Sequence, residues 1–234
     1  MPDLIQGALI SLPVVSRHGI FFWFLRTLVK VRWTFFLVTV LLGLRTRSVE
    51  GVLTWIVVAF FAIVLHECGH ALAARFYRQS PQIELHAMGG VTKWTWVDEL
   101  KWSQRVVISV AGPAAGFLLG GLIIGAGYLW PVVLPHWLAV ARYQFLWATL
   151  AWGVFNLLPL MPLDGGQTLA EVLEHRMGRD AGRLLARQIS IGTGIAGFAL
   201  GAAANEAWIA LLCGLLAFDN YQRMRGMPGV GLPG

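Results

Sequence analysis

The sequence has few charged residues. Only 13% of its 234 residues are Asp, Glu, Lys or Arg, whereas 57% are hydrophobic. A soluble domain usually carries about 25% charged residues, so the composition excludes an ordinary soluble domain. Together with a mean hydropathy of +0.66, this shortage of charge indicates a membrane protein.

Cysteine is also scarce. Cys68 and Cys213 are the only two, and both lie in apolar segments far apart in the chain. This spacing excludes a disulfide framework and a cysteine-rich zinc site. Internal repeats and Ser/Pro-rich linkers are absent too, so we expect a single domain over residues 1–234. The N-terminus has no basic segment ahead of an apolar core, and we expect no cleavable signal peptide.

Long apolar runs, in contrast, are abundant. Because a membrane-spanning helix needs about 20 apolar residues, we predict an all-α polytopic membrane protein with about six transmembrane helices. The predicted spans are residues 20–44, 51–74, 106–130, 137–158, 187–204 and 206–222. In the first, Arg26, Lys30 and Arg32 restrict the expected spanning part to about residues 33–44. Between the second and third spans, apolar and polar residues alternate from Ile83 to Ala87 and Gly89-Gly90 follows. This pattern predicts a short membrane-associated β-hairpin, or an edge strand pair, with its turn at Gly89-Gly90.

The basic residues are distributed unevenly over the connections between these spans. With the N-terminus in the cytoplasm, most of the 18 Lys and Arg residues fall on the cytoplasmic side, as the positive-inside rule requires. We therefore predict cytoplasmic N- and C-termini. The same distribution accounts for the net charge of +6, so we expect the lipid bilayer, and no nucleic acid, as a partner.

The segment HECGH, residues 66–70, lies at the end of the apolar run GVLTWIVVAFFAIVL. On a helix, His66 and His70 share one face and can bind the same metal ion. Glu67 can then reach a water held on that metal, which is the chemistry of the H-E-x-x-H pattern. Ionisable groups inside a membrane span are costly and indicate function. Cys68 points to the far side of the helix and is excluded as a ligand.

A zinc site with two histidines needs a third protein ligand. Asp164 occurs in NLLPLMPLDGGQTL, where Pro159 and Pro162 break the fourth span and Gly165-Gly166 allow the backbone to approach closely. By itself, Asp164 could instead be the N-cap of the helix that follows. Because a two-histidine site is already incomplete, the ligand interpretation is favoured.

These two motifs, in this order and spacing, resemble those of the site-2 protease family of intramembrane zinc metalloproteases. The resemblance covers about residues 30–225 and includes SVAGPAAG at 109–116. It is strongest to the small six-span sporulation-type bacterial branch, which has no PDZ or CBS domain. One departure is Gly116, where the family often has Asn.

The resemblance also implies roles for individual residues. It implies one Zn²⁺ per chain, with the ligands His66, His70 and Asp164. It implies that Glu67 is the catalytic general base, that Asn156 positions the substrate or polarises its carbonyl, and that Gly89 and Gly90 help to bind the substrate backbone.

The expected function is hydrolysis of a peptide bond in or near the transmembrane segment of a membrane-anchored regulatory protein. The family implies a pro-sigma or anti-sigma factor as substrate and the bacterial cytoplasmic membrane as location; a homo-oligomer is left open. Two alternatives are a membrane metal-ion transporter and an inactive relative that binds membrane helices. A transporter would need more polar residues along the bundle, and the intact Glu67 argues against an inactive relative. Serine- and aspartate-type intramembrane proteases are excluded, since G-x-S-x-G and paired G-x-G-D motifs are absent.

Overall fold

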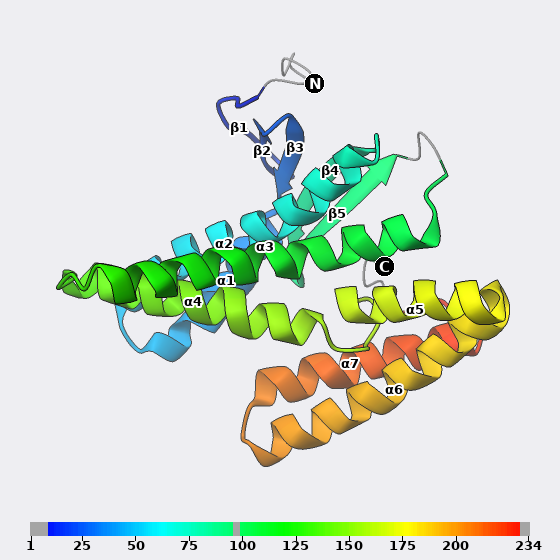
Figure 1. Ribbon diagram of the computed structural model, residues 1–234. Coiled ribbons are helices and arrows are strands. Elements are labelled where there is room, and N and C mark those ends of the chain that lie inside the picture. Colours follow the sequence, from blue (N-terminus) through cyan, green and yellow to red (C-terminus); the bar gives the residue numbers. More distant parts are fainter. Residues whose placement is uncertain (1–8, 96–98, 230–234) are drawn as a thin grey trace. The chain divides into compact units, whose positions relative to one another are not determined.

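The computed structural model describes residues 9–95 and 99–229. Within these residues the chain forms seven α-helices, a short 3₁₀ helix and five β-strands. They belong to two compact units, which are drawn together in Figure 1. Unit 1 comprises Met1–Glu99 and Ala111–Gly153, and unit 2 comprises Leu100–Val110 and Val154–Gly234.

Unit 1 contains a five-stranded mixed sheet. Its strands, in spatial order, are β1 (Val14–Ser16), β2 (Gly19–Phe24), β3 (Thr27–Val31), β4 (Ser80–His86) and β5 (Gly89–Thr95). Strands β3 and β4 pair in parallel, and the other neighbours pair antiparallel. The predicted hairpin before the third span is confirmed as β4–β5, but the predicted position of its turn is wrong, because the turn is Ala87–Met88 and Gly89-Gly90 begin β5. The prediction of an all-α fold is wrong, because this hairpin is only part of a larger sheet.

The outer bounds of the predicted span at 20–44 are wrong in the first half, whereas the expected spanning part at 33–44 coincides with a helix. Residues up to Val31 form β2 and β3, and helix α1 (Trp33–Gly43) begins only afterwards. Alternate residues of β3 are buried, namely Thr27, Val29 and Val31. The charged Lys30 lies between them, so the alternation of the strand turns its side chain away from the core. In a continuous membrane-spanning helix, Lys30 would instead lie inside the bilayer, at a cost in free energy.

Helix α2 (Val49–Phe76) packs against this sheet in the main core of unit 1. Its residues Val64, Cys68 and Ala71 join Phe35 of α1 and the buried residues of β3 and β4, Val29, Val31, Ile83 and Leu85. Cys68 is therefore a packing residue on the sheet-facing side of α2. This packing agrees with the prediction that it points away from the face shared by His66 and His70.

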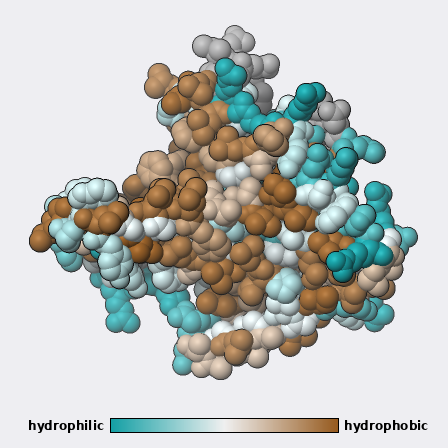
Figure 2. Space-filling model, viewed as in Figure 1, coloured by the Kyte–Doolittle hydropathy of each residue, from teal (hydrophilic) through white to brown (hydrophobic). Residues whose placement is uncertain are grey.

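Several of the helices have the length and apolarity expected of a membrane protein. Among the described residues, three helices are long and apolar enough to cross a membrane: α2, α3 (Trp102–Leu129) and α6 (Arg179–Ala203). They confirm the predicted spans at 51–74, 106–130 and 187–204. The other two predicted spans form helices α4 (His136–Asn156) and α7 (Ala207–Met224), which do not reach the same length and apolarity. Figure 2 shows many exposed apolar side chains, as expected for helices in lipid.

Unit 2 consists mainly of α5 (Asp164–Met177), α6 and α7. Helices α6 and α7 form an antiparallel pair in Figure 1. Glycines allow the close approach, since a Cβ at Gly197 would lie 2.6 Å from Sγ of Cys213 and one at Gly201 would lie 2.7 Å from the backbone nitrogen of Ala210. Such small-residue contacts are common between membrane helices.

Candidate metal centre

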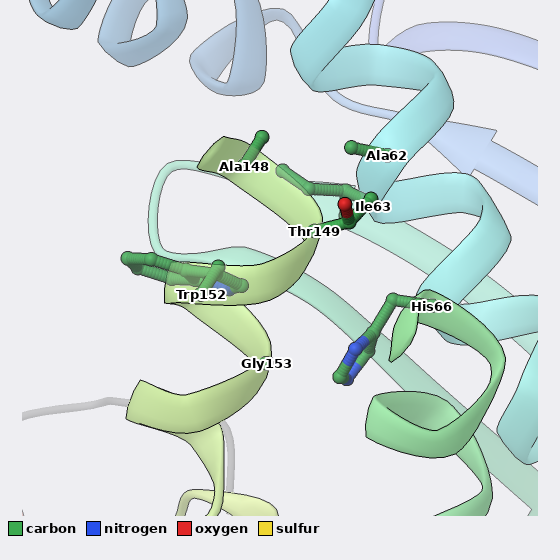
Figure 3. A pocket seen from close by; sticks show the side chains of 8 residues that line it. Ala62, Ile63, His66, Ala148, Thr149, Trp152 and Gly153 are labelled. Atoms are coloured by element: carbon green, nitrogen blue, oxygen red, sulfur yellow. The ribbon is translucent and has the colours of Figure 1, made fainter. Parts of the chain in front are cut away.

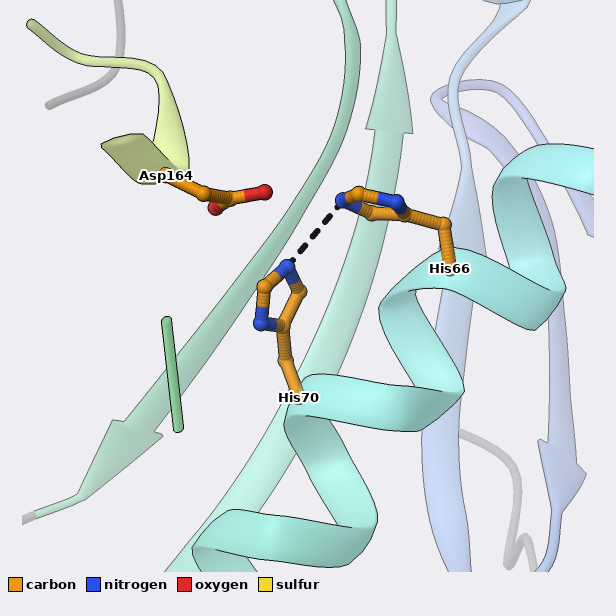
Figure 4. Close-up of side chains that lie close together, drawn as sticks. All are labelled: His66, His70 and Asp164. Carbon is orange, nitrogen blue, oxygen red and sulfur yellow. Dashed lines mark hydrogen bonds between the residues drawn. The ribbon is translucent and has the colours of Figure 1, made fainter. Parts of the chain in front are cut away.

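His66 and His70 lie one turn apart on α2, in the middle of unit 1. Both are buried, and their Nε2 atoms lie 3.1 Å apart, as the dashed line in Figure 4 shows. Two nitrogens bound to one tetrahedral zinc ion at about 2.0–2.1 Å would be about 3.3 Å apart. The two imidazoles are therefore arranged to bind a single metal ion, as the i, i+4 spacing predicted.

A glycine of α3 leaves space beside these two nitrogens. A Cβ at Gly112 would lie 2.2 Å from Nε2 of His70 and 2.8 Å from Nε2 of His66. On α2, a Cβ at Gly69 would lie 2.3 Å from the carbonyl oxygen of Ala111. These two glycines thus bring α2 and α3 into backbone contact and keep the histidine nitrogens accessible to a metal ion. The donor chemistry and this space together fit zinc.

Glu67 is buried beside strand β5. Thr92 on that strand lies with its Oγ1 2.7 Å from Oε2 of Glu67 and 3.1 Å from the backbone oxygen of Glu67. A Cβ at Gly90 would lie 2.5 Å from the other carboxylate oxygen, Oε1. The Thr92 hydroxyl and the bare backbone of Gly90 therefore define the position of the Glu67 carboxylate.

The structure gives Gly89 and Gly90 different environments. Gly89 begins β5 with a φ of +118°, a conformation that side chains rarely adopt, and it pairs with His86 across the two-residue turn. Gly90 lies against Glu67. A role for either glycine in binding substrate stays a prediction.

A cleft opens beside His66 between α2, α3 and α4 (Figure 3). Its lining residues are Ala62, Ile63, His66, Gly116, Ala148, Thr149, Trp152 and Gly153. At Gly116, a Cβ would lie 3.4 Å from the backbone oxygen of Thr149, so a small residue lets α3 and α4 pack closely at this point. The cleft is lined mostly by apolar and small side chains.

Asp164 and Asn156 belong to unit 2, at the two ends of the loop between α4 and α5. Asn156 is buried and is the last residue of α4. Asp164 is the first residue of α5, and the N-cap of that helix is Leu163, which makes no side-chain capping bond. The alternative in which Asp164 is the N-cap is therefore wrong.

Gly165 and Gly166 bring this loop onto the start of α5. A Cβ at Gly165 would lie 2.1 Å from the carbonyl oxygen of Leu157, and one at Gly166 would lie 2.4 Å from the backbone nitrogen of Met161. The predicted close backbone approach at Gly165-Gly166 is confirmed. The approaching backbone is the chain's own loop, residues 157–163.

A charged group lies on the sheet and forms ion pairs that do not involve His66 or His70. Glu84 of β4 is bonded to Arg32 and, at 3.2 Å, to Nζ of Lys93 on β5. Burial by itself would raise the pKa of Glu84, but the hydrogen bonds and charges of Arg32 and Lys93 outweigh it and hold this pKa below its usual value. The ion pairs thus link β4 to both neighbouring segments.

Comparison with solved structures identifies this arrangement of helices and strands. The structure of a site-2 protease from Methanocaldococcus jannaschii matches 92% of this chain and 95% of its own chain, with a TM-score of 0.61 and 22% identity. The chain has the site-2 protease fold. The sequence did not predict the first three strands of the sheet, β1 to β3.

Several curated proteins with similar sequences are named as zinc metalloproteases. A zinc metalloprotease of Methanocaldococcus jannaschii is 27% identical over 150 residues, covering 63% of this chain and 42% of its own length. Two proteins provisionally named as zinc metalloproteases also match. One, from Synechocystis, is 29% identical and covers 67% of this chain and 41% of its own length. Rip3 of Mycobacterium tuberculosis is 32% identical and covers 77% and 49%.

The chain thus spans less than half the length of these curated relatives. No protein-family model matches it. Within the site-2 protease fold, the structure adds two residues to those that the sequence indicated, Gly112 and Thr92. Gly112 lies in the segment SVAGPAAG that the resemblance includes, but no local pattern shows what it contacts, because Gly112 and Thr92 both act on a helix distant in sequence.

Proposed function

We propose that this protein is an intramembrane zinc metalloprotease that hydrolyses a peptide bond in or near the transmembrane segment of a membrane-anchored protein. The observation that carries this proposal is the buried pair of His66 and His70 on a membrane-length helix, with Glu67 between them. A buried carboxylate next to two metal-binding imidazoles is costly inside a membrane, and catalysis explains its presence.

The proposed zinc ligands are His66, His70 and Asp164. Each of them offers one ligand atom, a ring nitrogen or a carboxylate oxygen. Three protein ligands of this kind leave a fourth position of tetrahedral zinc open, which is the usual composition of a catalytic site. The space beside Gly112 and the names of the curated relatives support the same metal.

Three other residues have proposed roles in proton transfer and in binding the substrate: Glu67, Thr92 and Asn156. Zinc, when bound, lowers the pKa of a water molecule and polarises a carbonyl oxygen. Glu67 accepts a proton at its carboxylate and passes it to the leaving amine. The Thr92 hydroxyl holds Oε2 of that carboxylate, and the side-chain amide of Asn156 donates a hydrogen bond to the oxygen that becomes negatively charged.

The substrate backbone is proposed to bind along β5. A helical substrate hides its scissile carbonyl and must unwind, so an extended segment has to be held in place. Strand β5 is at the edge of the sheet, with β4 as its neighbour, and an edge strand can accept an extended peptide by β-augmentation. Gly89 and Gly90 lie at the start of this strand, close to Trp152 and Glu67 respectively.

The sequence motifs support a finer proposal. We propose a single catalytic domain of the small sporulation-type branch, in a bacterial cytoplasmic membrane with both termini in the cytoplasm. Its substrate would be a membrane-anchored pro-sigma or anti-sigma factor, and cleavage would release it from the membrane. The clustering of Lys and Arg in alternate connections supports this orientation.

Replacing Glu67 tests the proposed reaction. In cells that co-express a candidate substrate, E67Q should abolish cleavage, because an amide cannot accept the proton, while purified E67Q should keep its zinc. A matched control is E84Q, which should cleave normally, because the ion pairs of Glu84 do not involve His66 or His70. Equal cleavage by wild type and E67Q would overturn the proposal. Zinc transport without cleavage, unchanged in E67Q, would favour a transporter.

A further inference from the structure

Two fully buried polar side chains of unit 2 point at the loop that carries Asp164. Ser190 of α6 is 0% exposed and Asn220 of α7 is 2% exposed. Both helices are otherwise largely apolar, and a buried polar group costs free energy unless it is hydrogen-bonded. Their hydrogen bonds therefore show what these two side chains do.

Both side chains bind the backbone of Met161. The Met161 N–H donates to Oγ of Ser190 at 2.9 Å, and Nδ2 of Asn220 donates to the Met161 carbonyl at 2.7 Å. Each side chain is anchored on its own helix as well, because Ser190 donates to the carbonyl of Ala186 and Asn220 to that of Leu216, both at 2.8 Å. We refer to Ser190 and Asn220 as the Met161 clamp.

The donor hydrogens of both clamp side chains are all engaged in these hydrogen bonds. The hydroxyl hydrogen of Ser190 is directed to Ala186, so its oxygen is left to accept from Met161. The amide group of Asn220 has two hydrogens, and the two carbonyls of Leu216 and Met161 take them. Both main-chain polar groups of Met161 are thus fixed by one helix each.

Met161 lies in the loop 157–163, directly before the start of α5 at Asp164. Gly165 and Gly166 also pack closely against this loop, at the backbone of Leu157 and Met161. An irregular segment lacks the repeating hydrogen bonds that orient a side chain on a helix. The direction of the Asp164 carboxylate therefore depends on the contacts that fix this loop.

We propose that Ser190 and Asn220 are positioning residues that set the zinc affinity of Asp164 through the backbone of Met161. This inference rests on the proposed function, in which Asp164 is a zinc ligand. A merely structural clamp would lower the stability of unit 2 without changing metal affinity. A positioning clamp changes metal affinity, and only when Asp164 is present.

Zinc affinity measured by chelator competition on the purified full-length protein distinguishes the two roles. S190A and N220A should each raise the zinc Kd about 10-fold, the usual effect of removing a group that orients a metal ligand. The matched control is C213A, because Cys213 is 1% exposed on α7 and contacts Gly197 of α6. It removes one buried atom from the same helix pair and should lower the melting temperature with an unchanged zinc Kd.

The same substitutions in an Asp164→Asn background complete the test. There, S190A and N220A should cause no further rise in the zinc Kd, since the ligand that they position is gone. An unchanged Kd in the single variants, or the same loss with and without Asp164, would overturn the inference. A wild-type protein that binds no zinc would instead refute the proposed function, so the two failures are distinguishable.

Discussion

The two segments that carry the proposed zinc ligands are built in different ways. In HECGH of unit 1, the α2 backbone itself sets the separation of His66 and His70. In PLDGG of unit 2, the loop before Asp164 has an irregular backbone, fixed by two side chains of other helices and by the contacts of two glycines. Metal ligands on a continuous helix can be read from spacing, whereas a ligand at the end of a loop depends on contacts distant in sequence.

The largest effect on cleavage and zinc content is expected from filling the space beside His66 and His70. In G112A, the new Cβ would collide with Nε2 of both His66 and His70, so either the rings or α3 must move. Because misplacing a catalytic group by about 1 Å can cost about 100-fold in rate, we expect cleavage to fall about 100-fold and zinc content to fall with it.

G116A is the matched control for this prediction. It adds the same methyl group one turn along α3, where the nearest atom would be 3.4 Å away. It should keep its zinc and most of its activity. Full zinc occupancy in G112A would contradict the view that the helix backbone of unit 1 leaves its ligands no freedom to adjust.

A smaller effect is expected from replacing Thr92. This substitution tests whether the base Glu67 is positioned independently of the metal ligands. In T92V the hydroxyl that bonds to Oε2 of Glu67 is lost at nearly constant volume. Since outer-shell hydrogen bonds are worth about 10- to 100-fold, kcat should fall about 10-fold. Zinc affinity should stay the same, because no bond from Thr92 to His66 or His70 is involved.

T92S tests whether the hydroxyl is responsible. It keeps the oxygen and should restore kcat to within a few-fold of the wild type. A loss of zinc in T92V, measured by metal analysis of the purified protein, would show that the base and the ligands of unit 1 are not independently positioned.

The smallest effect concerns the sheet that supports α2. The pKa of Glu84 is lower in the folded protein than in the unfolded chain, so its ion pairs stabilise the fold above the unfolded pKa, near the ordinary value of 4.5. This stability is lost as the pH falls through the folded pKa. Both cationic partners are well exposed, and the contribution should be about 1 kcal/mol or less.

Melting temperatures of the detergent-solubilised protein between about pH 3 and pH 7 measure this contribution. E84Q should lower the melting temperature at neutral pH and show a weaker decline in acid than the wild type. K93M, which removes one of the two cations, should give an intermediate pH dependence. Identical acid profiles for the wild type and E84Q would contradict the prediction.

The sequence predicted the parts of the molecule in which local patterns decide the structure. The H-E-x-x-H spacing predicted the buried histidine pair, and the alternation from Ile83 to Ala87 predicted the β4–β5 hairpin. The β2–β3 hairpin was missed for a physical reason. Its turn consists of Leu25 and Arg26 in left-handed conformations, with φ of 47° and 56°, where Gly, Asn or Asp would be expected.

Strand β2 also lacks the usual alternation. After the buried Gly19, all of its residues are only partly buried, so apolar side chains occupy both faces and the run GIFFWF looks like part of a membrane helix. The partners of the candidate site were missed for another reason. Thr92, Gly112, Ser190 and Asn220 act on residues that are distant in sequence, so local patterns do not show what they contact.

The parallel pairing of β3 with β4 has a consequence for membrane insertion. Strand β3 directly precedes α1, and β4 follows α2, so the chain leaves the sheet along one helix and returns to the same sheet along the other. The register also places Val31 beside Ile20 of β2 on one side and Leu85 of β4 on the other, so the β1–β2 turn and the β4–β5 turn lie at the same end of the sheet. We therefore expect a membrane-impermeant label to give the same answer at either turn.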